Sequence, residues 1–134
     1  MPRPIEQVNI LDDDASVVRS LQELLASDGL MARVFQSPSE FLAYANNNPL
    51  GLVILDVWMP EINGLEVQAR LKKVSPQTRV IIITGRDEGF LAGTEGRSLR
   101  SLAIENGAFA FLTKPFDDEE FLGFVRSALE SAEI

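Results

Sequence analysis

The fold of this chain is decided by residues 52–64, which read LVILDVWMPEING. Four apolar residues of strand length run directly into Asp56, and Pro60 and Gly64 then mark a turn. A short, unbroken apolar run of this kind is typical of a strand buried on both faces of a parallel sheet. Because open α/β sheets carry their sites beyond the carboxyl ends of their strands, Asp56 is a candidate functional residue.

Three other apolar runs end in polar residues in the same way. They are residues 8–11, followed by Asp12, Asp13 and Asp14; residues 80–83, followed by Thr84 and Gly85; and residues 109–113, followed by Lys114 and Pro115. If these runs are parallel strands, their carboxyl ends meet at one edge of the sheet. The sequence therefore predicts that acids, a hydroxyl group and an amine converge at that edge.

Strand-like runs alternate with stretches of helical period along the chain. Strands are predicted at about 8–11, 31–35, 52–55, 80–83 and 110–113, and helices at about 15–27, from 37 to between 46 and 49, at 64–75, near 98–106 and from 117 to about 129. The apolar stripes expected to be buried are Val18, Leu21 and Leu25 on the first helix, Val67, Leu71 and Val74 on the third, and Phe121, Val125 and Leu129 on the last. We therefore expect one α/β domain with a doubly wound parallel sheet.

Composition narrows the class of protein. The 134 residues suit one domain, with Cys 0, and they contain neither a signal peptide nor an apolar stretch long enough to span a bilayer. A soluble cytoplasmic protein without a membrane partner is therefore expected. His 0 excludes histidine triads and histidine zinc sites, and the net charge of -8 opposes direct contact with nucleic acid.

The acids at the strand ends are candidate metal ligands. Asp12, Asp13 and Asp56 supply the carboxylate oxygens that Mg²⁺ prefers. A single acid at such a position is commonly a solvated turn or cap residue. Three acids on neighbouring strands favour a shared site instead, with Lys114 as a point charge suited to phosphate and Gly85 leaving room for a ligand near the backbone.

This set of residues resembles the receiver domain of two-component response regulators. The matching motifs are Leu11-Asp12-Asp13-Asp14, Asp56 with Met59-Pro60 and Gly64, Thr84-Gly85, and Lys114-Pro115-Phe116, in the family's order over about residues 5–130. The resemblance implies a single receiver domain over residues 1–134, with a flavodoxin-like (βα)5 sheet in the strand order 2-1-3-4-5. Residues 59–64 and 114–116 look most like receivers of the nitrogen-fixation regulator type, which are usually joined to DNA-binding domains.

The resemblance also implies a role for each acid. In that family, the aspartate at the position of Asp56 accepts a phosphoryl group from a phosphohistidine of a sensor histidine kinase or a phosphotransfer protein. The residues that match Asp12 and Asp13 hold Mg²⁺ together with Asp56 and the backbone carbonyl at the position of Trp58. A signalling domain is thus expected, whose only chemistry is its own phosphotransfer and autodephosphorylation.

Further positions match the phosphoryl contacts and the switch of receivers. Residues at the positions of Thr84 and Lys114 contact the phosphoryl oxygens, and an aromatic residue at the position of Phe111 turns inward as the threonine moves. Trp58 and Arg86 match positions that flank the path of the attacking water, where a bulky indole would slow hydrolysis. The chemistry suits a chain without histidine, because phosphoryl transfer needs positioning and charge neutralisation, and a carboxylate nucleophile is ionised at neutral pH.

The chain departs from the family's pattern between Thr84 and Lys114, where it is longer than usual. The excess falls in residues 85–96, which hold four of the chain's nine glycines. Such a composition favours a loop over a packed helix. We consider two interpretations, a lid over Asp56 that changes phosphoryl lifetime or partner choice, and a neutral surface insertion.

Three other functions fit parts of the sequence. A phosphatase of the haloacid-dehalogenase type would use Asp12 as nucleophile and Asp14 as acid. A calcium loop would take its ligands from Asp12, Asp14, Ser16 and Glu23, although Val17 stands where such loops need glycine. A receiver-like docking module would work without phosphorylation.

The expected output of the domain is a protein contact. No DNA-binding motif follows residue 130, so we expect a downstream protein or an effector domain outside this sequence to read the signal. The family usually signals through the fourth helix, fifth strand and fifth helix, here near 98–106 and 116–129. A homodimer linked to phosphorylation is a further candidate partner.

Overall fold

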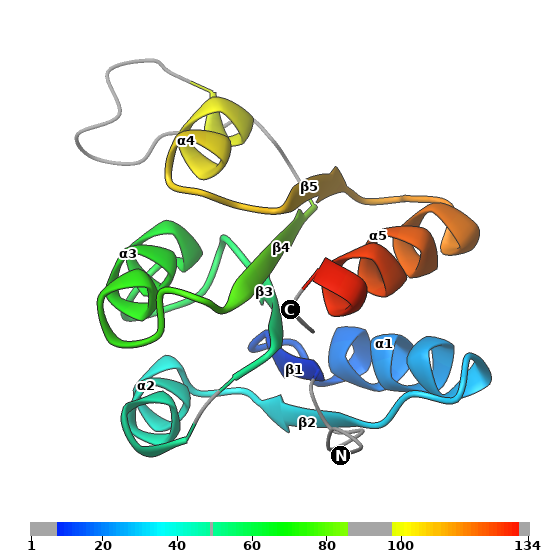
Figure 1. Cartoon of the computed structure of the whole chain (residues 1–134), viewed down its shortest axis with the longest axis horizontal. Coiled ribbons are helices and arrows are strands. Elements are labelled where there is room, and N and C mark those ends of the chain that lie inside the picture. Colours follow the sequence, from blue (N-terminus) through cyan, green and yellow to red (C-terminus); the bar gives the residue numbers. More distant parts are fainter. Residues whose placement is uncertain (1–7, 49, 86–97, 132–134) are drawn as a thin grey trace.

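The computed structural model describes residues 8–48, 50–85 and 98–131, which alternate between strands and helices (Figure 1). The strands are β1 (Val8–Leu11), β2 (Ala32–Phe35), β3 (Leu52–Asp56), β4 (Arg79–Thr84) and β5 (Ala110–Thr113). The helices are α1 (Ala15–Ser27), α2 (Pro38–Asn47), α3 (Gly64–Val74), α4 (Leu99–Glu105) and α5 (Asp118–Ser131). All strand pairs are parallel, in the order β2-β1-β3-β4-β5, so the predicted strand order is confirmed.

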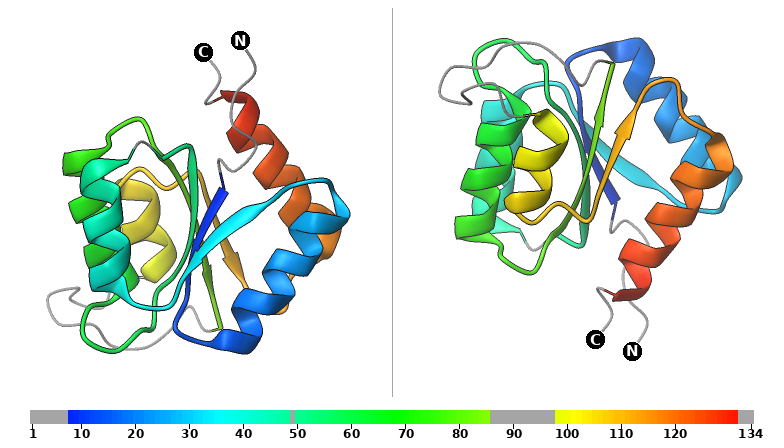
Figure 2. Two further views of the ribbon diagram at one scale, coloured as in Figure 1. Left: turned by 90° about the horizontal axis from the view of Figure 1, so that it is seen from below. Right: turned by 90° about the horizontal axis from the view of Figure 1, so that it is seen from above.

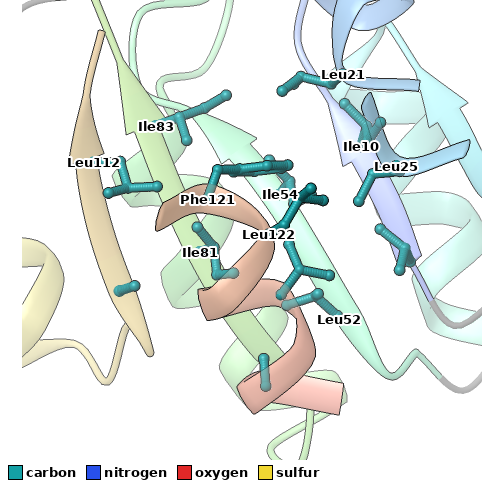
Figure 3. Packing of buried hydrophobic residues seen from close by; sticks show 14 of the residues in the cluster. Ile10, Leu21, Leu25, Leu52, Ile54, Ile81, Ile83, Leu112, Phe121 and Leu122 are labelled. Carbon is teal, nitrogen blue, oxygen red and sulfur yellow. The ribbon is translucent and has the colours of Figure 1, made fainter. Parts of the chain in front are cut away.

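Helices cover both faces of the sheet, which gives three layers. Helices α1 and α5 lie on one face, and α2, α3 and α4 lie on the other (Figures 1 and 2). The core beneath α1 and α5 centres on Phe121, which packs among side chains of β1, β3 and β4 (Figure 3). A second apolar cluster fills the space beneath α2, α3 and α4. The doubly wound architecture is therefore confirmed.

Local signals in the sequence explain where the helices begin and end. The side chains of Asp14, Ser37, Asn63 and Ser98 each accept a backbone N–H in the first turn of α1, α2, α3 and α4. Pro38 occupies the first turn of α2, where its missing N–H costs nothing. Gly29 ends α1 with a φ of 79°, and the Leu30 N–H donates to the Leu25 carbonyl as in a Schellman motif.

The predicted apolar stripes are confirmed on α1 and α5 and partly wrong on α3. Val67 and Leu71 are buried, but Val74 is 47% exposed, and the polar side chain of Gln68 is buried in its stead at 2% exposure. Val74 is the last residue of α3, so its side chain lies past the part of the helix that the sheet covers. Asp56 and Thr84, which were predicted to follow their strands, are themselves the last residues of β3 and β4.

None of the helices in the described part of the chain is long and apolar enough to cross a membrane.

Candidate functional site

A pocket of about 400 Å³ opens at the carboxyl ends of the strands. Its walls are Asp12, Asp13, Asp14, Val17, Asp56, Trp58, Gly85 and Lys114. These residues follow or end four different strands or begin α1, so the pocket exists only because the parallel sheet brings their ends together. The predicted convergence of acids and an amine at this edge is observed.

Asp56 is one of two buried acids in the pocket. It pairs with Ile83 in the sheet and is only 7% exposed. Burial raises the pKa of its carboxyl group to about 6, the neighbouring Asp12 adds to the rise, and Lys114 opposes it. Asp56 is thus mostly ionised at pH 7, as expected from the sequence, but with a smaller margin than an ordinary aspartate has.

Asp12 leaves one buried carboxylate oxygen without a hydrogen bond. Its Oδ1 accepts the Asp14 N–H at 2.9 Å, whereas Oδ2 has no hydrogen-bond partner within the described residues. The Lys114 ammonium group lies 3.8 Å from Oδ2. Burial raises the pKa of Asp12, against the hydrogen bond from Asp14 and the charge of Lys114. An orphaned, buried carboxylate oxygen needs a positive partner, which a cation would supply.

Carboxylate oxygens of Asp12, Asp13 and Asp56 all lie within 4.8 Å of one another. Asp13 is exposed to solvent while the other two acids are buried, so the group opens to water on one side. Three carboxylate oxygens with an open side fit Mg²⁺, which takes a few protein oxygens and keeps several waters. Trp58 lines the same pocket and is partly buried.

Lys114 crosses the strand edge from β5. Its backbone N–H donates to the Thr84 carbonyl at 2.8 Å, which ties the end of β5 to the end of β4. The peptide bond between Lys114 and Pro115 is cis. The Lys114 side chain is 30% exposed and reaches toward Asp12, the buried acid that follows β1, as the sequence predicted for an amine at this edge.

Two of the predicted switch residues lie outside the pocket lining. Thr84 is fully buried at the end of β4, and Phe111 is 4% exposed in the cluster beneath α4. The Arg100 guanidinium lies 4.9 Å from the centroid of the Phe111 ring, a cation–π contact from α4. Gly85 lines the pocket beside them. Arg86 and the remainder of the long 85–96 segment lie outside the described residues.

Gly64 holds the turn after Asp56 in place, a role that the sequence motif alone did not reveal. Its N–H donates to the Val57 carbonyl at 2.8 Å. A Cβ at this position would overlap the Asp56 carbonyl oxygen and lie 2.9 Å from the Val57 Cα. Only glycine allows α3 to begin this close to the strand end. The Glu61 backbone has a φ of 74°, in the left-handed region, within the same turn.

The calcium-loop interpretation is wrong for a structural reason, and the surroundings of Asp14 give the phosphatase interpretation no support. Asp14 caps α1, and hydrogen bonds from the Ser16 hydroxyl and from the Ser16 and Val17 N–H groups lower the pKa of its carboxyl, so it is a poor proton donor. Ser16 and Glu23 both lie within the continuous helix α1. The segment after Asp12 is therefore a capped helix and not a calcium loop.

The comparisons with known proteins agree with this geometry. Residues 8–126 match the family model described as the response regulator receiver domain. The response regulator protein TodT of Pseudomonas putida is 42% identical over 125 residues, which cover 93% of this chain and 52% of that protein. The transcriptional regulatory protein FixJ of Bradyrhizobium diazoefficiens is 32% identical over 126 residues, which cover 94% of this chain and 58% of that protein.

A solved structure shows the same fold. The receiver domain protein (CheY-like) from Methanospirillum hungatei JF-1 superposes with a TM-score of 0.79 at 25% identity, over 94% of each chain. The chain spans about half the length of the curated relatives it matches.

Proposed function

Since this chain belongs to the response regulator receiver domain family, we propose that Asp56 accepts a phosphoryl group from a phosphohistidine of a sensor histidine kinase or a phosphotransfer protein. The observation that carries the proposal is the position of Asp56, a nearly buried carboxylate that shares one pocket with three other acids and the Lys114 amine. A nucleophilic carboxylate beside cationic groups is what phosphoryl transfer to aspartate requires.

Asp12, Asp13, Asp56 and the backbone carbonyl of Trp58 would hold Mg²⁺ in this function. The support is the cluster of carboxylate oxygens and the orphaned Asp12 Oδ2. Bound Mg²⁺ would supply positive charge against the phosphoryl oxygens. It would also offset the repulsion between Asp12 and Asp56 that raises the pKa of Asp56.

In the transfer, a carboxylate oxygen of Asp56 forms a bond to phosphorus as the bond between phosphorus and the histidine nitrogen of the partner breaks. No protein base is needed, because Asp56 is mostly ionised before it reacts. Lys114 would neutralise the phosphoryl oxygens after leaving Asp12, from which it is separated by 3.8 Å. Gly85 carries no side chain to obstruct the incoming group.

The response would pass from the pocket to the face formed by α4, β5 and α5. Thr84 would move toward the phosphoryl group, and Phe111, which packs beneath α4, would sense that movement. Trp58, partly buried in the pocket wall, would shield the acyl phosphate from water. A downstream protein, an effector domain or a second copy of the chain would then read this face. We also propose that the domain acts in a phosphorelay and turns over no other substrate.

The test is to incubate the protein with Mg²⁺ and acetyl phosphate and to measure intact masses. A phosphoryl adduct is expected for the wild type, with none for Asp56→Asn and none in EDTA. Asp118→Asn, an exposed acid in the first turn of α5, is the matched control and should give the same adduct as the wild type. A folded protein that forms no adduct with any phosphodonor would instead support a docking module that works without phosphorylation.

Trp58 offers an independent readout of the metal. It is the only tryptophan of the chain and lines the acid pocket, so its fluorescence should respond to Mg²⁺ in the wild type. Asp13→Asn removes one exposed ligand and should weaken this response, whereas Asp118→Asn should leave it unchanged.

A further inference from the structure

The amide of Gln68 is a buried polar group between α3 and α4. These helices lie side by side on one face of the sheet (Figures 1 and 2). Gln68 is 2% exposed, and its Nε2 donates to the Ala103 carbonyl of α4 at 3.1 Å. Its Oε1 has no hydrogen-bond partner within the described residues. Burying an amide that is only half satisfied costs stability, so the side chain is poorly explained by packing alone.

The Ala103 carbonyl that Gln68 contacts belongs to the last turn of α4. Carbonyls in a last turn lack donors from their own helix, and two groups complete this one. The Ala108 N–H donates to it at 3.0 Å across the turn at Gly107, whose φ is 94°. Gln68 supplies the second bond from α3. One carbonyl thus joins α3, the end of α4 and the segment that leads into β5.

The other end of this connection is the strand that carries the acceptor. Gln68 lies four residues after Gly64, on the same side of α3. Gly64 rests against the Asp56 carbonyl and bonds to the Val57 carbonyl. A single turn of helix therefore separates the end of β3 from the amide that holds α4.

Packing between the carboxyl-terminal ends of α3 and α4 is incomplete. A cavity of about 50 Å³ lies there, with Gln68, Lys72 and Asn106 in its lining. Helix α4 has seven residues and buries only Leu99 and Ala103 of them. Where apolar contacts are few, a single buried hydrogen bond has a larger share in setting the position of a helix.

We propose that Gln68 is a positioning residue that fixes the corner between α4 and β5 relative to the strand end at Asp56. A change at the acceptor then reaches α4 through the first turns of α3, in addition to any movement of Thr84. The coupling part of this inference rests on the proposed function, because it needs a signal that starts at Asp56. The holding part needs only the resting protein.

The test compares amide hydrogen exchange of the wild type, Gln68→Met and Gln22→Met. Methionine keeps the length of glutamine while removing both the donor and the orphaned oxygen, and Gln22 is exposed on α1, so it is the matched control. In resting protein, Gln68→Met should exchange about tenfold faster at the Asn106 and Ala108 amides, which bond to α4 carbonyls. Amides of β1 and β3 should change less than about twofold.

The coupling is measured with Mg²⁺ and beryllofluoride as a stand-in for the phosphoryl group. The change in exchange at Asn106 and Ala108 on adding beryllofluoride should fall by at least about half in Gln68→Met, while the Trp58 response to Mg²⁺ is retained. Gln68→Leu, which also removes the donor and the orphaned oxygen without burying a charge, should show the same local effect and provides a second variant if the first is poorly folded.

Two results would overturn the inference. One is exchange in both Gln68 variants that matches the wild type at Asn106 and Ala108, and the other is faster exchange spread equally over β1 and β3, which marks ordinary destabilisation. If beryllofluoride changes nothing in the wild type, the proposed function and the coupling fail together. The resting-state comparison still decides whether Gln68 holds the corner.

Discussion

The half of the molecule around β1, β3 and α1, which carries the acids, and the half around α4 are held in place by different kinds of contact. Strands β1 and β3 are buried along their whole length, and α1, which has thirteen residues, lies with α5 over the same face of the sheet (Figure 1). Helix α4 has seven residues. The Gln68 side chain donates a hydrogen bond to this helix, and the Arg100 side chain makes a cation–π contact from it. In the proposed function, the chemistry would therefore take place where side chains are fixed, and the response would use an element held by few contacts.

The largest loss of stability is expected at the turn after β3, where the backbone leaves no room for a Cβ at Gly64. Gly64→Ala would force a Cβ against the Asp56 carbonyl, so the turn or α3 must shift. A loss of roughly 3 kcal/mol or more in the free energy of unfolding is expected, measured by urea denaturation. Gly123→Ala in α5 is the control, because a Cβ there meets nothing within 4 Å, and it should be neutral or slightly stabilising. Equal stability of the two variants would break the comparison.

The acid pocket should stabilise the protein less as the pH rises. The folded-state pKa of Asp56, about 6, lies above its ordinary value of 3.8. The folded protein therefore keeps a proton that the unfolded chain has lost, and the free energy of unfolding falls as the pH rises through this range. Asp56→Asn removes the loss and should be more stable than the wild type by roughly 3 kcal/mol at pH 8 in EDTA, with no difference near pH 3.

Mg²⁺ should reduce the difference in stability between Asp56→Asn and the wild type. If Mg²⁺ binds the folded wild type at the proposed site, adding it should raise the stability of the wild type more than that of Asp56→Asn. Thermal unfolding with and without EDTA measures both effects. If Asp56→Asn is less stable than the wild type at pH 8 in EDTA, the account of the pocket is contradicted.

Lys114→Met tests the amine that faces both buried acids. Lys114 lowers the pKa of Asp12 and of Asp56, so its removal should raise both. Fewer ionised nucleophiles and less positive charge should slow adduct formation from acetyl phosphate by about tenfold or more at pH 6.5. Arg19→Met, on the exposed side of α1, is the control. An unchanged rate in Lys114→Met would remove the lysine from the proposed chemistry.

The smallest effect should come from the surface between α1 and α5. Arg126 forms two hydrogen bonds of 2.8 Å to Asp28, the C-cap residue of α1. Arg126→Met should lower Tm by no more than about 2 °C at low salt, and the difference should vanish in 1 M NaCl. Exchange at the amides of α4 should not change. Faster exchange there would show that the two halves are less separate than the comparison holds.

Much of the fold and of the pocket could be predicted from the sequence. Apolar runs that end in Asp12, Asp56 and Thr84 define both the strands and their functional ends, because a parallel sheet aligns them. The acid pocket followed from this order, and the family comparison later confirmed the resemblance. The assignments of individual roles within the pocket stay predictions.

Contacts between distant segments could not be predicted in the same way. Helical periodicity placed Val74 in the buried stripe, but α3 ends there, and Gln68 is buried because α4 lies over it. The role of Gly64 depends on how closely the backbone of Asp56, earlier in the same turn, approaches it, which residue type alone does not encode. Arg86 and the Gly-rich segment that contains it fall outside the described residues.

The central claim is that Asp56 is the residue that carries the phosphoryl group. Reduction of an aspartyl phosphate with sodium borohydride converts that side chain to homoserine, which tandem mass spectrometry locates in the sequence. After treatment with Mg²⁺ and acetyl phosphate, the account predicts homoserine at position 56 and at no other acid of the pocket. Homoserine at position 12 or 13, or none in a protein that binds Mg²⁺ normally, would contradict it.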